Sequence, residues 1–244
     1  MAMFLNRFTR LRGLGRYACL GSGVLKELGR GSKFHNLQKG RSDYLIRVLE
    51  DPAIGCQPAR VVSHLARDYI AATLEQQAVL CPDFVPKLVL LDSFSDLTDQ
   101  LFRHKSEGWE FCCNYHDLQH SESFNSEFEC LGLLDLAQLE VQYSRLLQTI
   151  ETQWPGIPVI YLHFPDVLEV RGKFLERARL IREAVARCAL KYINIYSFVV
   201  SDQIVQRAEV LDPGLEDFPY HYNHATYVEF AKLILAQPVL RKLF

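Results

Sequence analysis

Short apolar runs alternate along this chain with longer segments whose apolar residues recur every three or four positions. The short runs, bounded by glycine, proline or charged residues, predict buried strands at residues 16–20, 85–91, 159–162 and 193–195. The longer segments predict helices at residues 24–28, 44–49, 59–74, 133–153, 174–190, 198–208 and 227–235. Strands that alternate with helices of this length favour parallel crossovers. The pattern therefore predicts an α/β fold, a three-layer α/β/α sandwich with a mainly parallel sheet.

The size and composition of the chain are those of one large domain. Its 244 residues are 49% hydrophobic and 23% charged, which is enough apolar material to bury one sizeable core. We expect residues 1–244 to form this single domain, with a polar, irregular insertion around residues 105–129.

Charge and cysteine content narrow the classes of partner and compartment. A formal net charge of −2 gives no reason to expect a nucleic acid or an anionic membrane as partner. No apolar stretch approaches the roughly 18 residues that a membrane span needs, and the first residues lack the apolar centre of a secretory signal. The seven cysteines are irregularly spaced, which fits a reducing compartment better than a disulfide framework. These features predict a cytoplasmic protein.

Two residues near opposite ends of the chain carry the candidate chemistry. Ser22 follows the apolar run at 16–20 within a Gly-Ser-Gly turn, and His221 precedes the final amphipathic helix. A serine hydroxyl becomes a nucleophile when a base takes its proton, a role that histidine often fills. Ser22 and His221 therefore form a candidate nucleophile and base. The structural alternatives are a helix N-cap for Ser22 and a surface-loop histidine for His221.

Polar residues at the ends of predicted strands are candidates for substrate contacts. Asp92 and His163 each directly follow a predicted strand, and parallel sheets bind ligands beyond the carboxyl ends of their strands. We expect both residues to line the substrate pocket, although a packed core histidine explains His163 equally well. Residues 112–120 pair two cysteines with two histidines in a partial zinc-site spacing, but they lack a C-x₂-C pair. We therefore favour two buried cysteines there and expect no metal.

The first and last blocks of the chain resemble those of the SGNH, or GDSL-like, hydrolase superfamily. CLGSGVL resembles the first block of the divergent members that carry Gly-Ser, and it puts Ser22 at the nucleophile position. HYNHATYVEFAKLIL resembles the last block, with His221, Asn223 and Tyr227 at matching places before an apolar helix. The resemblance extends from Ser22 to the closing helix and implies a flavodoxin-like SGNH hydrolase fold. We expect Asn223 to contact the substrate.

The acid of the implied triad departs from the family pattern. The family places it three residues before the histidine, a position that Phe218 holds here, whereas Asp217 stands four residues before His221. Asp217 is the candidate acid. The alternatives are Asp212, reached through a different loop shape, or a Ser-His dyad with no acid.

The oxyanion hole is the second departure. The resemblance implies that the amides of Ser22 and Gly40 donate to the oxyanion. The asparagine donor expected after the strand at 85–91 is replaced by the sequence DSFSD, so Ser93 or Ser95 would supply the third donor.

The resemblance implies a serine esterase or O-acyltransferase that acts on an acylated sugar or a small metabolite through an acyl-serine intermediate. Its partner is then a small-molecule ester or acyl donor, and no cofactor is required. The oligomeric state stays open. The alternative is a non-catalytic SGNH-fold binding or assembly protein, and its support in the sequence is the replaced asparagine and the displaced acid.

Overall fold

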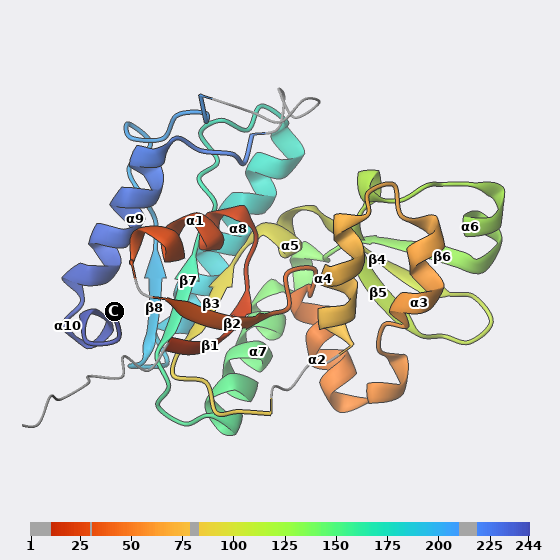
Figure 1. The fold of residues 1–244 in the computed structure, drawn as a ribbon, viewed down its shortest axis with the longest axis horizontal. Helices are drawn as coiled ribbons and strands as arrows, with labels where there is room; N and C mark the ends of the chain where they lie inside the picture. Colours follow the sequence, from red (N-terminus) through yellow and green to blue (C-terminus); the bar gives the residue numbers. More distant parts are fainter. Residues whose placement is uncertain (1–10, 30, 79–82, 210–218) are drawn as a thin grey trace, which may run out of the picture.

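The computed structural model describes residues 11–29, 31–78, 83–209 and 219–244, and it contains two β-sheets flanked by helices (Figure 1). The larger sheet is parallel throughout, with the strand order β2-β1-β3-β7-β8. Its strands are β1 (Leu11–Arg16), β2 (Ser32–Asn36), β3 (Val89–Asp92), β7 (Val159–Leu162) and β8 (Ile195–Phe198). The three central strands are buried almost throughout, so this sheet forms the middle of the core.

The long helices fall into two groups that flank the parallel sheet. One group packs α1 (Cys19–Glu27) against α9 (His224–Ala236), with the short α10 (Pro238–Arg241) following. The other group packs α7 (Leu139–Gln153) against both α2 (Ser42–Glu50) and α8 (Gly172–Ala189). A parallel sheet between two helix layers is the predicted α/β architecture and is compatible with a three-layer sandwich.

The first strand lies earlier in the chain than its apolar pattern predicted. Residues 16–20 were expected to form a strand, but β1 ends at Arg16 and α1 begins at Cys19. Two of the six residues of this strand are Gly13 and Gly15, so its sequence shows no continuous apolar run. Glycine is needed at both positions because neighbouring aromatic rings occupy the space of a side chain. A Cβ at Gly13 would lie 2.3 Å from the ring of Phe34, on the neighbouring strand β2. The shift moves Ser22 from the expected turn into the second turn of α1.

The second sheet occupies the region predicted to be a polar insertion. It is antiparallel, with the order β5-β4-β6, and Figure 1 shows it to one side of the parallel sheet. Its strands are β4 (Asp99–His104), β5 (Glu110–Asn114) and β6 (Phe128–Leu133), joined through the 3₁₀ turn η3 (Tyr115–Asp117) and α6 (Glu122–Glu127). The prediction of an irregular segment at 105–129 is therefore wrong.

An aromatic cluster explains why this region folds. Phe102 and Phe111 stack with their ring centroids 5.2 Å apart, while Phe128 meets Trp109 at 5.5 Å and Phe124 at 5.0 Å. All five rings are buried. Aromatic pairs bury large areas and favour these geometries, so few residues suffice to form a small core within a segment of polar composition.

Several predicted helices differ from the structure in extent. The helix at 59–74 is broken into α3 (Pro58–Val61), η2 (Val62–His64) and α4 (Tyr69–Gln77). The helix at 198–208 is absent, because β8 extends to Phe198 and turns follow it. The remaining elements are η1 (Pro52–Ile54), α5 (Phe94–Thr98) and η4 (Leu136–Gln138). Within the described ranges, no helix has both the length and the apolar character needed to cross a bilayer.

The contact between α1 and α9 gives a test of this packing. A Cβ at Gly23 would lie 2.6 Å from the ring of Tyr227, whereas a Cβ at Gly172 would meet nothing within 4 Å. We expect Gly23→Ala to lower the free energy of unfolding by about 1–3 kcal/mol, because the added methyl overpacks the interface. Gly172→Ala is the matched control and should be neutral or slightly stabilising. Urea denaturation of both variants measures the difference, and equal stabilities would contradict the described packing.

Candidate functional site

The strand order of the parallel sheet defines one place where a ligand is expected. From β1 the chain passes outward to β2 and then returns to β3 on the other side of β1. Ligands of open α/β sheets bind at the carboxyl ends of the strands where the order reverses. Here this edge is formed by residues 17–19 after β1 and residues 92–93 at the end of β3, and we call it the crevice.

Asp92 fixes the two sides of the crevice to each other. Its Oδ2 accepts the backbone N–H of Ala18 at 2.7 Å, and its Oδ1 accepts the N–H of Phe94 at 3.1 Å. Burial raises the pKa of the Asp92 carboxyl to about 7, although these two hydrogen bonds and the charge of Arg16 oppose the shift. The carboxyl is thus an integral part of the turn between β1 and α1, rather than a free group that faces a substrate.

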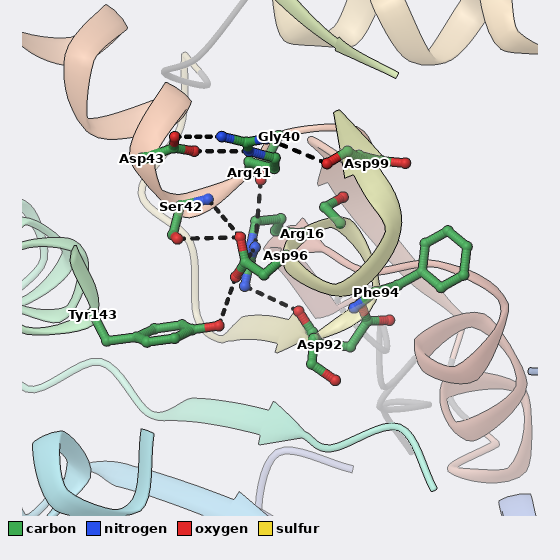
Figure 2. A network of polar contacts seen from close by, with 12 residues as sticks. Arg16, Gly40, Arg41, Ser42, Asp43, Asp92, Phe94, Asp96, Asp99 and Tyr143 are labelled. Atoms are coloured by element: carbon green, nitrogen blue, oxygen red, sulfur yellow. Dashed lines mark hydrogen bonds and ion pairs between the residues drawn. The ribbon is translucent and has the colours of Figure 1, made fainter. Parts of the chain in front are cut away.

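A buried ion pair lies behind the crevice (Figure 2). Arg16 Nη1 is 2.7 Å from Asp96 Oδ2, and both side chains are almost fully buried. Asp96 also accepts hydrogen bonds from the backbone N–H of Ser42 at 2.8 Å and from the hydroxyl of Tyr143 at 2.6 Å. Burial favours the neutral carboxyl, but the charge of Arg16 and these donors outweigh it and lower the pKa of Asp96. Arg16 Nη2 donates to the carbonyl of Asp92 at 2.9 Å, so the ion pair also holds the end of β3.

Other buried cations hold the segment that follows β3. Arg177 of α8 donates to the carbonyls of Asp96 and Leu97, which have no partner within the short helix α5. Lys39 Nζ lies 2.9 Å from Asp117 Oδ2 and 3.4 Å from Asp99 Oδ1. These contacts connect α5 to α8 and connect the β2–α2 loop to the second sheet. The loops around the crevice are consequently well fixed.

Cys19, in the first block, contacts the residue that directly precedes the last block. It is the first residue of α1, and its Sγ lies 3.3 Å from the carbonyl oxygen of Tyr220, to which the thiol donates. Burial and the charge of Asp92 raise the pKa of this thiol to about 12. Cys19 therefore stands at the carboxyl end of β1 as a protonated thiol, next to the peptide that precedes His221.

The last block packs on the loop that follows β7. The hydroxyl of Tyr220 donates to Glu169 Oε2 at 2.6 Å, and that of Tyr222 donates to the carbonyl of Pro165 at 2.8 Å. In the sequence, half-buried His221 stands between these two buried tyrosines. Its backbone carbonyl accepts a hydrogen bond from the N–H of Ala208 at 3.1 Å. The aromatic neighbours thus anchor the segment at the crevice.

Asn223, which was predicted to contact the substrate, caps a helix in the structure. It is the N-cap of α9, and its Oδ1 accepts from the backbone N–H of Thr226 at 3.2 Å and from the hydroxyl of the same residue at 2.6 Å. A capping asparagine satisfies an otherwise unpaired donor of the first turn. This oxygen is therefore already engaged by the helix.

Ser22 has no side-chain hydrogen bond to the last block among the described residues, although its helix α1 packs on α9. Ser22 is exposed on α1 and lines a shallow hollow together with Tyr17, Lys26 and Gly29 and with residues 31–32 at the start of β2. No residue of the last block lines this hollow. The structure brings Cys19, rather than Ser22, into contact with the segment that contains His221.

The two backbone amides expected in the oxyanion hole are already used. The N–H of Ser22 donates to the carbonyl of Ala18 at 3.1 Å, and the N–H of Gly40 donates to the carbonyl of Leu37 at 2.8 Å. An oxyanion donor must be free to point at the reacting oxygen. The expectation that these two amides serve this purpose conflicts with both hydrogen bonds, because each N–H is directed at a carbonyl within the chain.

Ser93 and His163 lie near strand ends but face different surroundings. The hydroxyl of Ser93 is buried and accepts from the N–H of Phe164 at 3.1 Å. His163 is buried too, with its Nε2 2.8 Å from the hydroxyl of Ser197 and its ring beside that of Tyr161. Burial and the charge of nearby Arg182 lower the pKa of His163 to about 3, so its ring is neutral. The histidine packs on the α8 side of the sheet, which fits the alternative of a packed core residue.

Some of the expected site residues have no described position. Asp217, Asp212 and Phe218 lie outside the described residues, so the identity of a triad acid stays a prediction. The segment with partial zinc-site spacing is described: its two cysteines are buried in β5, and the ring of His120 stacks on Tyr115 at 3.7 Å. Among the residues that the structure describes, no three His, Cys, Asp or Glu side chains are grouped to hold a metal.

Cys19 is the crevice residue that the apolar pattern concealed. It lies in the run RYACL, which reads as part of a buried strand because four of its five residues are apolar or aromatic. Arg16 is the signal that could have identified Cys19. A charged residue is rarely placed inside a buried strand, so Arg16 is better read as the end of the strand than as its start. With the strand ended at Arg16, Cys19 falls at the start of the following helix.

Comparisons with known proteins assign no relationship to this chain. No protein-family model matches it, and no curated protein matches it at a significant level. The candidate site is therefore defined by its geometry alone.

The buried ion pair gives a prediction about stability. We expect Asp96→Ala to lower the free energy of unfolding by about 3–5 kcal/mol, because Arg16 is left buried without its counter-charge. Glu183→Ala removes an exposed partner of Arg179 and is the control, with an expected change below about 1 kcal/mol. Chemical denaturation of the two variants provides the comparison. Similar losses would show that the Asp96 network contributes no more than a surface ion pair.

The raised pKa of Asp92 gives a prediction about pH. The folded carboxyl holds its proton more tightly than the unfolded one, whose pKa is about 4. The free energy of unfolding should therefore fall as pH rises from about 4 to about 7, by an amount on the order of 1–4 kcal/mol. In Asp92→Asn this part of the pH dependence should disappear. Parallel curves for the two proteins would mean that the hydrogen bonds from Ala18 and Phe94 keep the carboxylate ionised.

Proposed function

We propose that the chain is an SGNH-like acyl-ester hydrolase or acyltransferase in which Cys19, rather than Ser22, is the nucleophile. The observation that carries this proposal is the contact between the Cys19 thiol and the carbonyl of Tyr220 at 3.3 Å. This contact joins the first block to the residue directly before the last block, at the carboxyl edge of the sheet. His221 is the next residue and is the proposed base.

The strand order supports the SGNH-like part of the proposal. When the five strands of this sheet are numbered in chain order, their spatial order is 2-1-3-4-5, which is also the flavodoxin-like order. In this topology, the chemistry is expected at the turn after the first strand, where Cys19 begins α1. The N–H groups of a first helical turn have no carbonyl partner within the helix. These N–H groups, rather than those of Ser22 and Gly40, are the proposed oxyanion donors.

The proposed reaction proceeds through a thioester. Cys19 Sγ attacks the acyl carbonyl and forms the S–C bond, while its proton passes to His221. The ester C–O bond then breaks, and His221 returns the proton to the leaving alcohol oxygen. Water attacks the thioester in hydrolysis, or an acceptor alcohol attacks it in transfer, and Cys19 recovers its proton. An acylated sugar or a small acylated metabolite is the proposed substrate class.

The protonation state of the thiol sets a condition on this mechanism. Because burial and Asp92 raise the pKa of Cys19 to about 12, the thiolate is rare at neutral pH. The thiol proton must then leave during the attack itself, which requires a base in direct reach. His221, whose backbone nitrogen is bonded to the Tyr220 carbonyl, is the residue proposed for that role.

A non-catalytic binding protein of SGNH-like fold is the second candidate. The observation that favours it is the full use of the expected polar groups: the amides of Ser22 and Gly40 donate within the chain, and both oxygens of Asp92 accept backbone N–H groups. A crevice whose polar groups satisfy each other is stable without a substrate. In this case the crevice would bind a ligand without forming a covalent intermediate.

Acyl trapping distinguishes the two candidates. The purified protein is incubated with a short-chain p-nitrophenyl ester, quenched in acid and analysed by peptide mass spectrometry. We expect an acyl adduct on Cys19 that disappears in Cys19→Ala and falls by about 10²-fold or more in His221→Ala, because the proton acceptor is lost. Ser22→Ala should keep the adduct. Cys130, an exposed thiol on β6 remote from the last block, is the internal reference for non-specific acylation.

Two outcomes would contradict the cysteine mechanism. An acyl or fluorophosphonate adduct on Ser22 that depends on His221 would restore the serine mechanism. Acylation of Cys19 at no more than the rate of Cys130 would favour the binding protein. Near-ultraviolet circular dichroism of each variant checks that the fold is kept.

A further inference from the structure

An apolar cavity lies on the other side of β1, between the parallel sheet and the helices α2 and α7. Its volume is about 40 Å³. Most of its lining is aliphatic, from β1, β3, α2 and α7, and it includes Leu14, Val89, Leu91, Leu45, Leu146 and Ile150. It reaches the surface where partly exposed Leu49, Thr149 and Trp154 meet exposed Gln153.

Arg16 gives this cavity one polar feature. It is one of the lining residues and is 2% exposed. Its two Nη atoms donate to Asp96, to the carbonyl of Asp92 and, at 3.5 Å, to the carbonyl of Gly40. Its Nε is buried and has no hydrogen-bond partner among the described residues. A buried N–H without an acceptor is costly, and such groups call for an explanation.

We propose that this cavity is a binding site for a small apolar molecule with one hydrogen-bond acceptor, such as a ketone, that accepts from Arg16 Nε. The aliphatic lining favours a hydrocarbon body, and the buried, unpartnered donor at Arg16 specifies the acceptor. The acceptor is neutral, because Asp96 already balances the charge of Arg16. The site stands independently of the function proposed for the crevice, since neither Cys19 nor any residue of the last block lines it.

The size and position of the cavity limit the ligand further. A single water needs roughly 10–15 Å³ of comparable volume, so about 40 Å³ accommodates a group of only a few heavy atoms. A larger ligand would have to extend to the opening between Leu49 and Thr149. The acceptor then lies at the inner end, beside Arg16, and the hydrocarbon part points towards the opening.

Trp154 at the opening provides the measurement. The chain has two tryptophans, and the other, Trp109, is buried in the second sheet. Cyclopentanone is the probe, and cyclopentane is the matched molecule without an acceptor. We expect a saturable change in tryptophan fluorescence with cyclopentanone, absent in Trp154→Phe, and an affinity about tenfold higher than that of cyclopentane measured in the same way.

A variant that narrows the opening completes the test. Leu49→Phe, at a partly exposed position of the lining, should weaken cyclopentanone binding by about tenfold or more. Leu233→Phe, at a partly exposed position of α9 outside the lining, should leave it unchanged. If fluorescence changes only linearly with concentration, or if Leu49→Phe binds as wild type does, the proposed site is wrong. Equal affinities for the two probes would overturn the role of Arg16 Nε and the ligand class with it.

Discussion

The buried ion pair between Arg16 and Asp96 is the interaction on which the arrangement of this molecule depends. A charge in the protein interior is tolerated only when it is paired and its remaining hydrogen-bonding positions are filled. The partners that fill them come from different elements: Ser42 at the start of α2 and Tyr143 in α7 (Figure 2). The end of β1, the start of α2, and the helices α5 and α7 must therefore come together for the charge to be stable. Arg177 extends the same logic to α8, because it donates to carbonyls of α5.

The ion pair also determines how the crevice is built. Asp96 holds α5 in place, and Asp92 lies at the end of β3 just before that helix. Asp92 in turn accepts the N–H of Ala18, which sets the start of α1 and hence the position of Cys19. The contact between Cys19 and Tyr220 is thus the last step in a series of fixed contacts that begins in the core. A site supported in this way holds its geometry without help from a ligand.

The sequence predicted the layers of this fold better than its local chemistry. Apolar periodicity is a property of a whole element, so four of the five parallel strands and the long helices α7 and α8 were predicted, with boundaries shifted by a few residues. The edge strand β2 (Ser32–Asn36), with its polar composition, was not predicted. The partners of a buried charge are far apart in sequence, and no local pattern marked Arg16 as the partner of Asp96, 80 residues away. The second sheet was missed for a related reason: five aromatic rings in the segment Phe102–Phe128 form its core, whereas the average composition there is polar. The residue at the carboxyl end of the first strand also differs from the expected one. Because β1 ends at Arg16, Cys19 rather than Ser22 begins the following helix.

Arg16 stands at the border between the two regions with functional potential. Its Nη atoms bind the groups that support the crevice, while its Nε remains for the cavity on the α2 and α7 side. The next residues, Tyr17 and Ala18, lead directly into the crevice, and Asn36 holds the backbone of Tyr17 with hydrogen bonds of 3.0 and 2.9 Å. A guanidinium is planar and rigid, so a change in the direction of Nε also redirects both Nη atoms. An acceptor bound in the cavity would therefore act on the same group that orients Asp96 and the end of β3, and this links the cavity to the carboxyl edge of the sheet through one side chain.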